Sequence, residues 1–544
     1  MKFNVIKRDG PGRIGDLTIN KKSIATPNIY FVNTTRFKAP HFADLTISNK
    51  DDLNKSEGLF IVENAQQLFQ KSKKFVDSVV EFKKESYDKA LFLPTVGEPV
   101  NLALLVYLGI DLFDSISAIT AARNDEILFP TGKINKKNLR ELSCNCPICS
   151  KYKGKPSEMN FDEILNHNYH SLLNEIKNVR NAIYNNQLRG LVETRVINDP
   201  HLTSILRNLD NNHYLFLEKQ TPLTSNSTIF ATSKEVFNRP EIKRFQERII
   251  KRYKKPKSAK MLLLLPCSAK KPYSFSQSHK LFREKLFFSG NPNVVHEVII
   301  TSPIGIVPRE LELVYPASNY DIPVTGIWDE DEKKMIRSLL TEYIKNNKYE
   351  KIISHLPPEI MEFTEDLLHD AIKTCIDKPT SKKSLEKLSK VLKKEVNKYE
   401  KVKPQNRKIE DVLSLAYYQF DKKPAELLLK NSNIRGKYPY QKIISDGKQL
   451  GMIVQERGLI SLTLDGAEKI KDTGTYWVEI YDDFELKGSV FAPGIKDCDE
   501  NIRIGDEVVV LQKKKLFGVG VATMNGHDMK RLKYGEAIKT RHHA

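Results

Sequence analysis

The chain has 544 residues, a formal net charge of +19 and a hydrophobic content of 40%. This length exceeds one typical domain, so we expect three or four compact cores. The positive charge favours a polyanionic partner, above all nucleic acid. The sequence shows neither an apolar run of the roughly 20 residues that a membrane span needs nor a signal-peptide pattern, so we expect a cytoplasmic protein without membrane contact.

The first part of the chain alternates short apolar runs with helical periodicity. "ALFLPTV", for example, precedes "VNLALLVYLGIDLF". This alternation is typical of α/β architecture, in which strands feed helices. A basic helix is predicted from Arg239 onward, and Pro256 stops it. We therefore expect a first domain over residues 1–255.

Within this domain, Cys144, Cys146 and Cys149 form a C-x-C-x-x-C loop. Three thiolates on a tight loop can share one tetrahedral ion, and a fourth ligand closes a structural zinc site. His167 in "HNYH" is the candidate, with His170 as its neighbour. The remaining cysteines are scattered, which fits a metal site in a reducing compartment better than disulfides.

Residues 1–255 resemble the tRNA-guanine transglycosylase family, in the opening segment, in "GIDLFDSISAITAARN", in "CNCPIC" and in "HNYHSLLNEIKNVRNAI". The resemblance implies a truncated or degenerate TIM-barrel-like domain with Cys144, Cys146, Cys149 and His167 on zinc. The family's nucleophile matches Asp114, but its Asp-Ser-Gly-Gly segment is missing. Base exchange needs both a nucleophile and an acid/base partner. We therefore expect a scaffold that holds tRNA, with Asp114 as a substrate-binding residue or a relic.

A second α/β domain is expected over residues 256–400. Its first strand runs into "LLLLPCSAKKPYSFSQSH", which brings together five candidate catalytic residues: Cys267, Lys271, Tyr273, Ser276 and His279. Open α/β sheets bind ligands at the carboxyl ends of their strands. The neighbouring lysines favour a thiolate, and a histidine can carry protons. The plain alternative is a small core cysteine at a strand exit.

This motif, with "TSPIGIVPRELELVYPASNYDIPVTGIWD" downstream, resembles the archaeal archaeosine synthase family. The resemblance implies a tRNA substrate that carries 7-cyano-7-deazaguanine (preQ0) in the D-arm, and lysine as amine donor, with glutamine or ammonia as alternatives. It also implies a radical S-adenosylmethionine partner enzyme. Cys267 either attacks the nitrile or neighbours it. Asp321 and Asp329 are candidates for binding the donor's amino group, or belong to a solvated acidic turn.

The remaining chain predicts a small α+β connector over residues 401–472 and a β-rich module over residues 473–544. "IRIGDEVVV", "FGVGVA" and "AIKTRHH" resemble the PUA domain, an RNA-binding pseudo-barrel. Its basic side chains are predicted to contact phosphate. They are Lys513, Lys514, Lys515, Lys530, Arg531 and Arg541. The alternative is a stabilising β domain with a basic rim.

Two other functions stay open at this point. A true transglycosylase would release guanine and depend on Asp114. A non-catalytic subunit would present tRNA to the radical enzyme and leave the cyano base untouched. The sequence also leaves a homodimer open.

Overall fold

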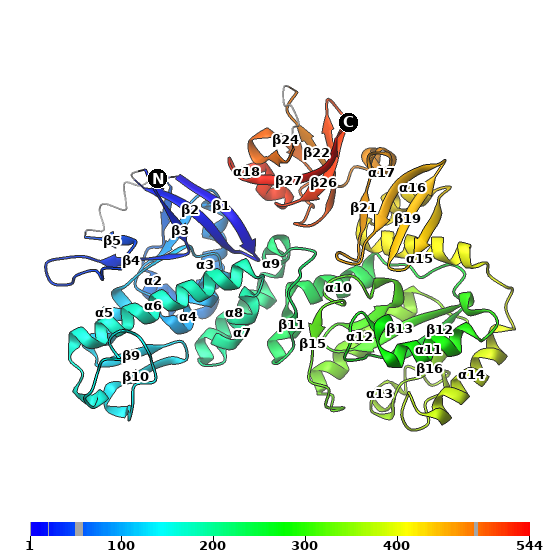
Figure 1. The fold of residues 1–544 in the computed structure, drawn as a ribbon, viewed down its shortest axis with the longest axis horizontal. Helices are drawn as coiled ribbons and strands as arrows, with labels where there is room; N and C mark the ends of the chain where they lie inside the picture. The colour runs from blue at the N-terminus through cyan, green and yellow to red at the C-terminus, as the bar shows by residue number, and fades with distance from the viewer. Residues whose placement is uncertain (1, 20, 49–57, 483–487, 544) are drawn as a thin grey trace. The chain divides into compact units, whose positions relative to one another are not determined.

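A computed structural model describes residues 2–19, 21–48, 58–482 and 488–543. The chain divides into two compact units, which Figure 1 colours along the sequence. The first unit comprises residues 1–222, 491–493 and 527–537, and the second comprises residues 223–490, 494–526 and 538–544. Each unit has a hydrophobic core of its own.

The first unit contains a parallel sheet with the strand order β5-β4-β8-β7-β6. Its strands are β5 (Leu45–Ile47), β4 (Asn28–Val32), β8 (Leu112–Asp114), β7 (Ala90–Leu93) and β6 (Leu59–Ile61). An antiparallel sheet of β1 (Lys2–Asp9), β2 (Gly12–Ile19) and β3 (Lys22–Thr26) precedes it. Strand β7 is apolar and buried throughout, because both faces of the sheet are covered. The α/β architecture is confirmed, and the derivation of this sheet from a barrel stays a prediction.

Helices follow the strands of the first unit in the chain. They are α2 (Ala65–Phe69), α3 (Ser72–Glu85), α4 (Pro99–Tyr107), α5 (Ile116–Arg123), α6 (Phe161–Tyr184), α7 (Leu188–Val196), α8 (Pro200–Asn212) and α9 (Tyr214–Gln220). A hairpin of β9 (Glu126–Phe129) and β10 (Gly132–Asn135) lies between α5 and α6 in the chain. Helix α6 starts at a capping box in which Asn160 and Glu163 bond each other's backbone.

The α/β core of the second unit is a sheet with the order β14-β13-β12-β16-β17. Its strands are β14 (Gly305–Pro308), β13 (Val295–Thr301), β12 (Met261–Pro266), β16 (Lys351–Ser354) and β17 (Ile372–Lys373). Strand β12 runs parallel to both neighbours, so its carboxyl end lies beside that of β13. The predicted strands at β12, β13 and β16 are confirmed. The helices are α10 (Pro240–Lys251), α11 (Gln277–Phe287), α12 (Glu330–Asn346), α13 (Pro358–Thr364) and α14 (Lys382–Val396).

The rest of the second unit holds two further sheets. The connector has α15 (Pro404–Phe420), α16 (Lys422–Leu429), α17 (Leu464–Ile470) and the meander β18 (Asn433–Lys437), β19 (Tyr440–Ser445), β20 (Lys448–Ile453) and β21 (Ile460–Leu462). The terminal module has the strand order β23-β27-β26-β25-β22-β24. In that order, the strands span Val490–Phe491, Glu536–His543, Lys515–Ala522, Glu507–Gln512, Trp477–Ile480 and Ile495–Cys498. Helix α18 spans Gly526–Arg531, and residues 527–537 of this module belong to the first unit. Among the described residues, the helices lack the combination of length and apolar character that crossing a bilayer requires.

Candidate active site and metal cluster

Three cysteines and one histidine gather near the start of α6. Cys144, Cys146 and Cys149 lie on the loop after the β9–β10 hairpin, and His167 lies on α6. One ligand atom from each residue lies within 4.8 Å of the others. The Nδ1 atom of His167 is 3.2 Å from the sulfur of Cys149 and 3.7 Å from that of Cys146. These four residues could hold one metal ion.

The backbone of the hairpin determines which nitrogen His167 presents. Its Nε2–H donates to the carbonyl oxygen of Leu128 at 3.1 Å, so Nδ1 faces the sulfur atoms. The next residue, Asn168, accepts a hydrogen bond from the N–H of Leu128 at 2.9 Å. A carbonyl partner of this kind orients histidine ligands in metal sites. The ring of His170 instead packs on that of Phe42, with 4.5 Å between centroids.

Cys267 lies where β12 ends, at the carboxyl edge of the core sheet. Its backbone N–H donates to the carbonyl of Ile300 at 3.1 Å, which keeps the start of the loop in register with β13. Burial raises the pKa of the thiol, and a hydrogen bond with Thr301 and the charge of Lys271 lower it by less. The surroundings of the thiol therefore favour its protonated form, and the thiolate suggested by the neighbouring lysines stays a prediction.

A chain of hydroxyl groups lies next to Cys267. The hydroxyls of Tyr273 and Tyr320 are 2.8 Å apart, and Tyr320 also hydrogen-bonds to Thr301. The ammonium of Lys271 lies 4.0 Å from the centroid of the Tyr320 ring. Burial lowers the pKa of Lys271 and raises the pKa of both tyrosines. The lysine is thereby easier to deprotonate, while the tyrosines remain hydrogen-bond donors.

Ser276 and His279 hold the loop from the side of α11. The hydroxyl of Ser276 caps this helix and accepts a hydrogen bond from the backbone N–H of His279 at 3.3 Å. The buried His279 ring donates from Nε2 to the carbonyl of Pro266 at 3.1 Å, and its Nδ1 accepts from Arg309 at 2.8 Å. Burial, followed by the charge of Arg309, lowers the pKa of His279 to about 3. Both ring nitrogens of His279 are thus engaged in this structure, and its role as a proton carrier stays a prediction.

Arg309 is a cation beside the motif loop that the sequence analysis did not single out. Its guanidinium donates to Glu297 at 2.8 Å and to Glu312 at 2.9 Å, in addition to His279. Glu312 in turn accepts a hydrogen bond from the backbone N–H of Ser274 in the motif loop, at 2.9 Å. Both carboxylates are buried. The available signal was the run of charged residues inside the otherwise apolar segment "IGIVPRELELVYP".

The two acidic residues predicted to bind substrate have different surroundings. Asp321 is exposed on β15 (Tyr320–Asp321), and its charge raises the pKa of Lys271 against the effect of burial. Asp329 caps α12 by accepting hydrogen bonds from the N–H groups of Asp331 and Glu332, at 2.9 and 3.0 Å. Asp321 therefore belongs with the motif loop, and Asp329 is engaged in a helix cap.

Asp114 occupies the carboxyl end of β8, the central strand of the first unit. It accepts hydrogen bonds from the N–H groups of Thr95 at 3.1 Å and Ile116 at 3.0 Å. Burial outweighs these bonds and raises the pKa of Asp114 to about 6. The residue lines a cavity of about 430 Å³ that Pro94 and Asn64 also line. Asp114 thus offers this cavity a carboxyl group that changes charge near pH 6.

The basic side chains predicted to contact RNA lie at several places. Lys513 and Lys514 form the turn between β25 and β26, with backbone φ of 51° and 61°, and Lys515 follows them. Lys530 and Arg531 lie on α18. All five are exposed, as phosphate contacts require.

Arg541 differs from these five because its guanidinium has partners within the second unit. It donates to Glu507 at 3.0 Å and to the carbonyl of Leu462 at 3.2 Å. Arg457 also pairs with Glu507, whose side chain is fully buried. Arg457, Glu507 and Arg541 form a joint between the terminal sheet and the connector. Arg541 therefore has a structural contact within the second unit.

Three family models match parts of the chain. The model described as queuine tRNA-ribosyltransferase matches residues 56–200, and a domain of unknown function (DUF5591) matches residues 242–392. The PUA domain matches residues 483–544.

Curated relatives match nearly the whole chain. The archaeosine synthase of Haloferax volcanii is 36% identical over 546 residues, which cover 98% of this chain and 89% of that protein. The archaeosine synthase subunit alpha of Methanosarcina acetivorans is 35% identical, covering 90% of this chain and 80% of that protein. The tRNA-guanine(15) transglycosylase of Methanobrevibacter smithii is 29% identical, covering 83% of this chain and 66% of that protein.

Replacing Arg309 by Met is expected to destabilise the second unit, because Glu297 and Glu312 would remain buried without a cation. Removing one partner of a buried ion pair costs about 3–5 kcal/mol. Urea unfolding monitored by tryptophan fluorescence measures this change, since Trp328 and Trp477 both lie in the second unit.

The matched control for this variant is Arg337→Met, which breaks the exposed pair of Arg337 with Asp366. We expect its unfolding transition to coincide with that of the wild type. Coinciding transitions in both variants would show that the Arg309 cluster carries no stability.

Asp114 is expected to make the first unit less stable as the pH rises. Its pKa is about 6 when folded and about 3.9 when unfolded, so the folded chain binds the extra proton between these values. The stabilisation is present below about pH 4 and lost as the pH rises to about 6, by about 3 kcal/mol in total. Asp114→Asn should remove this slope and melt higher than the wild type above about pH 6. Melting curves recorded across this range test it, with exposed Asp88→Asn as control; a variant with the wild-type slope would contradict it.

Proposed function

Because the chain belongs to the archaeosine synthase family, we propose that it is a tRNA-modifying transferase. Its substrate is a tRNA that carries 7-cyano-7-deazaguanine in the D-arm, and its product carries an amine added to the nitrile of that base. The observation that carries this proposal is the group of half-buried Cys267 and Lys271 with buried Tyr320, which lies where open α/β sheets bind ligands.

The proposed reaction joins an amine nitrogen to the nitrile carbon. A C–N bond forms while one π bond of the nitrile breaks, the amine loses a proton, and the nitrile nitrogen gains one. Free lysine is our preferred donor, ahead of glutamine and ammonia. A radical S-adenosylmethionine enzyme then cleaves the adduct to leave the amidine of archaeosine. We place the reaction in the cytoplasm, with a homodimer and a stable partner complex as arrangements to test.

Lys271 and the tyrosines suit the two proton transfers. The lowered pKa of Lys271 favours removal of a proton from the attacking amine. The hydroxyl of Tyr320, supported by Tyr273 and Thr301, is placed to donate to the developing imidate nitrogen. Asp321 is the acidic residue that we assign to the donor's reacting amine before it loses its proton, because its charge already acts on Lys271.

Cys267 has two roles to distinguish. In one, its sulfur attacks the nitrile and forms a thioimidate that the amine displaces. In the other, the amine attacks directly and the thiol stays a neutral neighbour. The raised pKa of the thiol supports direct attack, because a thioimidate requires a base to take the thiol proton first.

We propose that both units contact the tRNA. The exposed lysines at the β25–β26 turn contact phosphates in the terminal module, as PUA domains of RNA-modifying enzymes do. In the first unit, Asp114 contacts a base rather than a sugar carbon, since the sequence offers no Asp-Ser-Gly-Gly base to assist exchange.

The test incubates the full chain with cyano-modified tRNA and lysine, then measures nucleoside masses after digestion. Lys271→Met is expected to lower the rate of adduct formation at least about 100-fold, because a general base is lost. Cys267→Ala is expected to lower it less than about tenfold if the amine attacks directly. Lys270→Met, at the exposed neighbouring position, is the control.

Three outcomes would contradict parts of this proposal. An unchanged cyano base with the wild type would favour the non-catalytic, tRNA-presenting subunit. Guanine released from unmodified tRNA would favour base exchange. Complete loss of adduct in Cys267→Ala would favour the thioimidate route.

We also propose that the metal in the Cys/His cluster is zinc, since three thiolates and one imidazole are the donors of structural zinc sites. Mass spectrometry of the purified chain should find one zinc per chain. His167→Ala should lower the zinc retained against a chelator at least about tenfold. His170→Ala, outside the cluster, should retain it, and equal retention by both variants would contradict this ligand set.

A further inference from the structure

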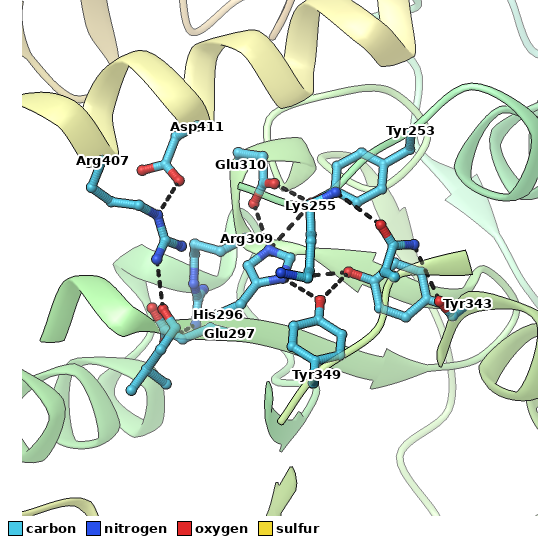
Figure 2. Close-up of polar contacts among 12 residues, drawn as sticks. Tyr253, Lys255, His296, Glu297, Arg309, Glu310, Tyr343, Tyr349, Arg407 and Asp411 are labelled. Atoms are coloured by element: carbon cyan, nitrogen blue, oxygen red, sulfur yellow. Dashed lines mark hydrogen bonds and ion pairs between the residues drawn. The ribbon is translucent and has the colours of Figure 1, made fainter. Parts of the chain in front are cut away.

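The second unit contains a cavity of about 340 Å³, which Ser274 of the motif loop helps to line. It is bordered by α11, β13, α15 and the connector, and its lining mixes apolar side chains with four cationic and four acidic ones. Figure 2 shows Arg407 and Asp411 on α15 facing Glu310 and His296 across this region. A lining with both signs of charge suits a ligand that itself carries both.

Most of the acidic groups around the cavity have partners inside the protein. Glu297 and Glu312 bind Arg309, and Glu310 lies 3.1 Å from Nε2 of His296 and hydrogen-bonds to Tyr253. These three carboxylates are therefore occupied by partners within the protein. The other charged side chains of the lining determine what the cavity can bind.

Three cationic side chains of the lining have donor groups without a partner in the protein. Among the described residues, Arg283 and Lys408 have neither a hydrogen-bond nor an ion-pair partner, and the buried Nε–H of Arg309 has no acceptor. A buried N–H donor without an acceptor is costly. That cost applies to Arg309 alone, because Arg283 is exposed and Lys408 is half-buried. Together the three cations offer donors to an oxyanion, such as a carboxylate.

One acidic group offers the opposite charge. Asp411 lies three residues after Lys408 on α15, so both are on the same face of the helix. Asp411 accepts a hydrogen bond from Arg407 at 2.6 Å, and its side chain is 36% exposed. Burial and the nearby charge of Glu310 raise the pKa of Asp411. An ammonium group placed here would relieve this repulsion.

We infer that this cavity binds a free amino acid, with its carboxylate at Arg283 and Lys408, its ammonium at Asp411, and its aliphatic chain against Leu286 and Val412. A phosphate or RNA backbone fits less well, because the lining carboxylates would repel it. An uncharged apolar ligand would leave the unpaired cations without a partner. That this amino acid is the amine donor of the reaction rests on the proposed function.

The cavity shares residues with the motif loop. Arg309 lines it and bonds to His279, and Ser274 lines it and bonds to Glu312. The proposed amino-acid site and the motif loop therefore share part of one cavity wall.

Isothermal titration of the full chain, without tRNA, tests the inference with three probes: L-lysine, L-norleucine and cadaverine. Lysine and norleucine share the carboxylate and the α-ammonium, so their affinities should agree within about fivefold. Cadaverine lacks the carboxylate and should bind at least about tenfold more weakly. Equal affinity for cadaverine, or no binding of lysine, would overturn the inference.

Two variants test the position of the site. Lys408→Glu and Arg283→Glu should each weaken lysine binding at least about tenfold, while Lys390→Glu on the exposed face of α14 should leave it unchanged. Circular dichroism melts identify any variant that fails to fold. Lysine binding unaffected by both lining variants would place the site elsewhere. If the chain binds lysine at this site but forms no adduct on modified tRNA, the proposed function is contradicted while the amino-acid site is supported.

Discussion

The buried guanidinium of Arg309 holds together the parts of the second unit that meet at the motif loop. It bonds at once to a strand residue, Glu297, to the imidazole of His279 on α11, and to Glu312, which binds the loop backbone. A charge of this kind costs several kcal/mol to bury, so the fold must supply all of its partners together. The strand, the helix and the loop are consequently held in one arrangement.

Burial also determines the chemistry available around that arrangement. The same low-dielectric surroundings raise the pKa of the Cys267 thiol and lower the pKa of Lys271, so both groups favour their uncharged forms. In the first unit, burial raises the pKa of Asp114 and so favours its uncharged form as well. A nitrile is a weak, neutral electrophile, and uncharged groups with movable protons suit its addition chemistry better than fixed charges do.

The sequence predicted the parts of the fold and site that depend on local pattern. Strand β12 is an unbroken apolar run, and the Cys/His cluster is confined to residues 144–167, so both could be located from spacing alone. The contact of Arg309 with His279 joins positions 30 residues apart, and only the folded sheet brings them together. The state of the Cys267 thiol could not be predicted either, because nearby lysines in the sequence say nothing about burial. Asp329 is different: the acidic residues after it form a capping signal, which the sequence analysis did not use when it considered Asp329 for substrate binding.

The joint of Arg457, Glu507 and Arg541 gives the terminal module two kinds of electrostatic contact with opposite sensitivity to salt. The lysines of the β25–β26 turn are exposed, so ions screen their attraction to phosphate. Glu507 is buried between its two arginines, where screening is weak. As ionic strength rises, the module should therefore release RNA while its attachment to the connector stays intact. A bound tRNA can then dissociate without disturbing the register between the module that holds it and the rest of the second unit.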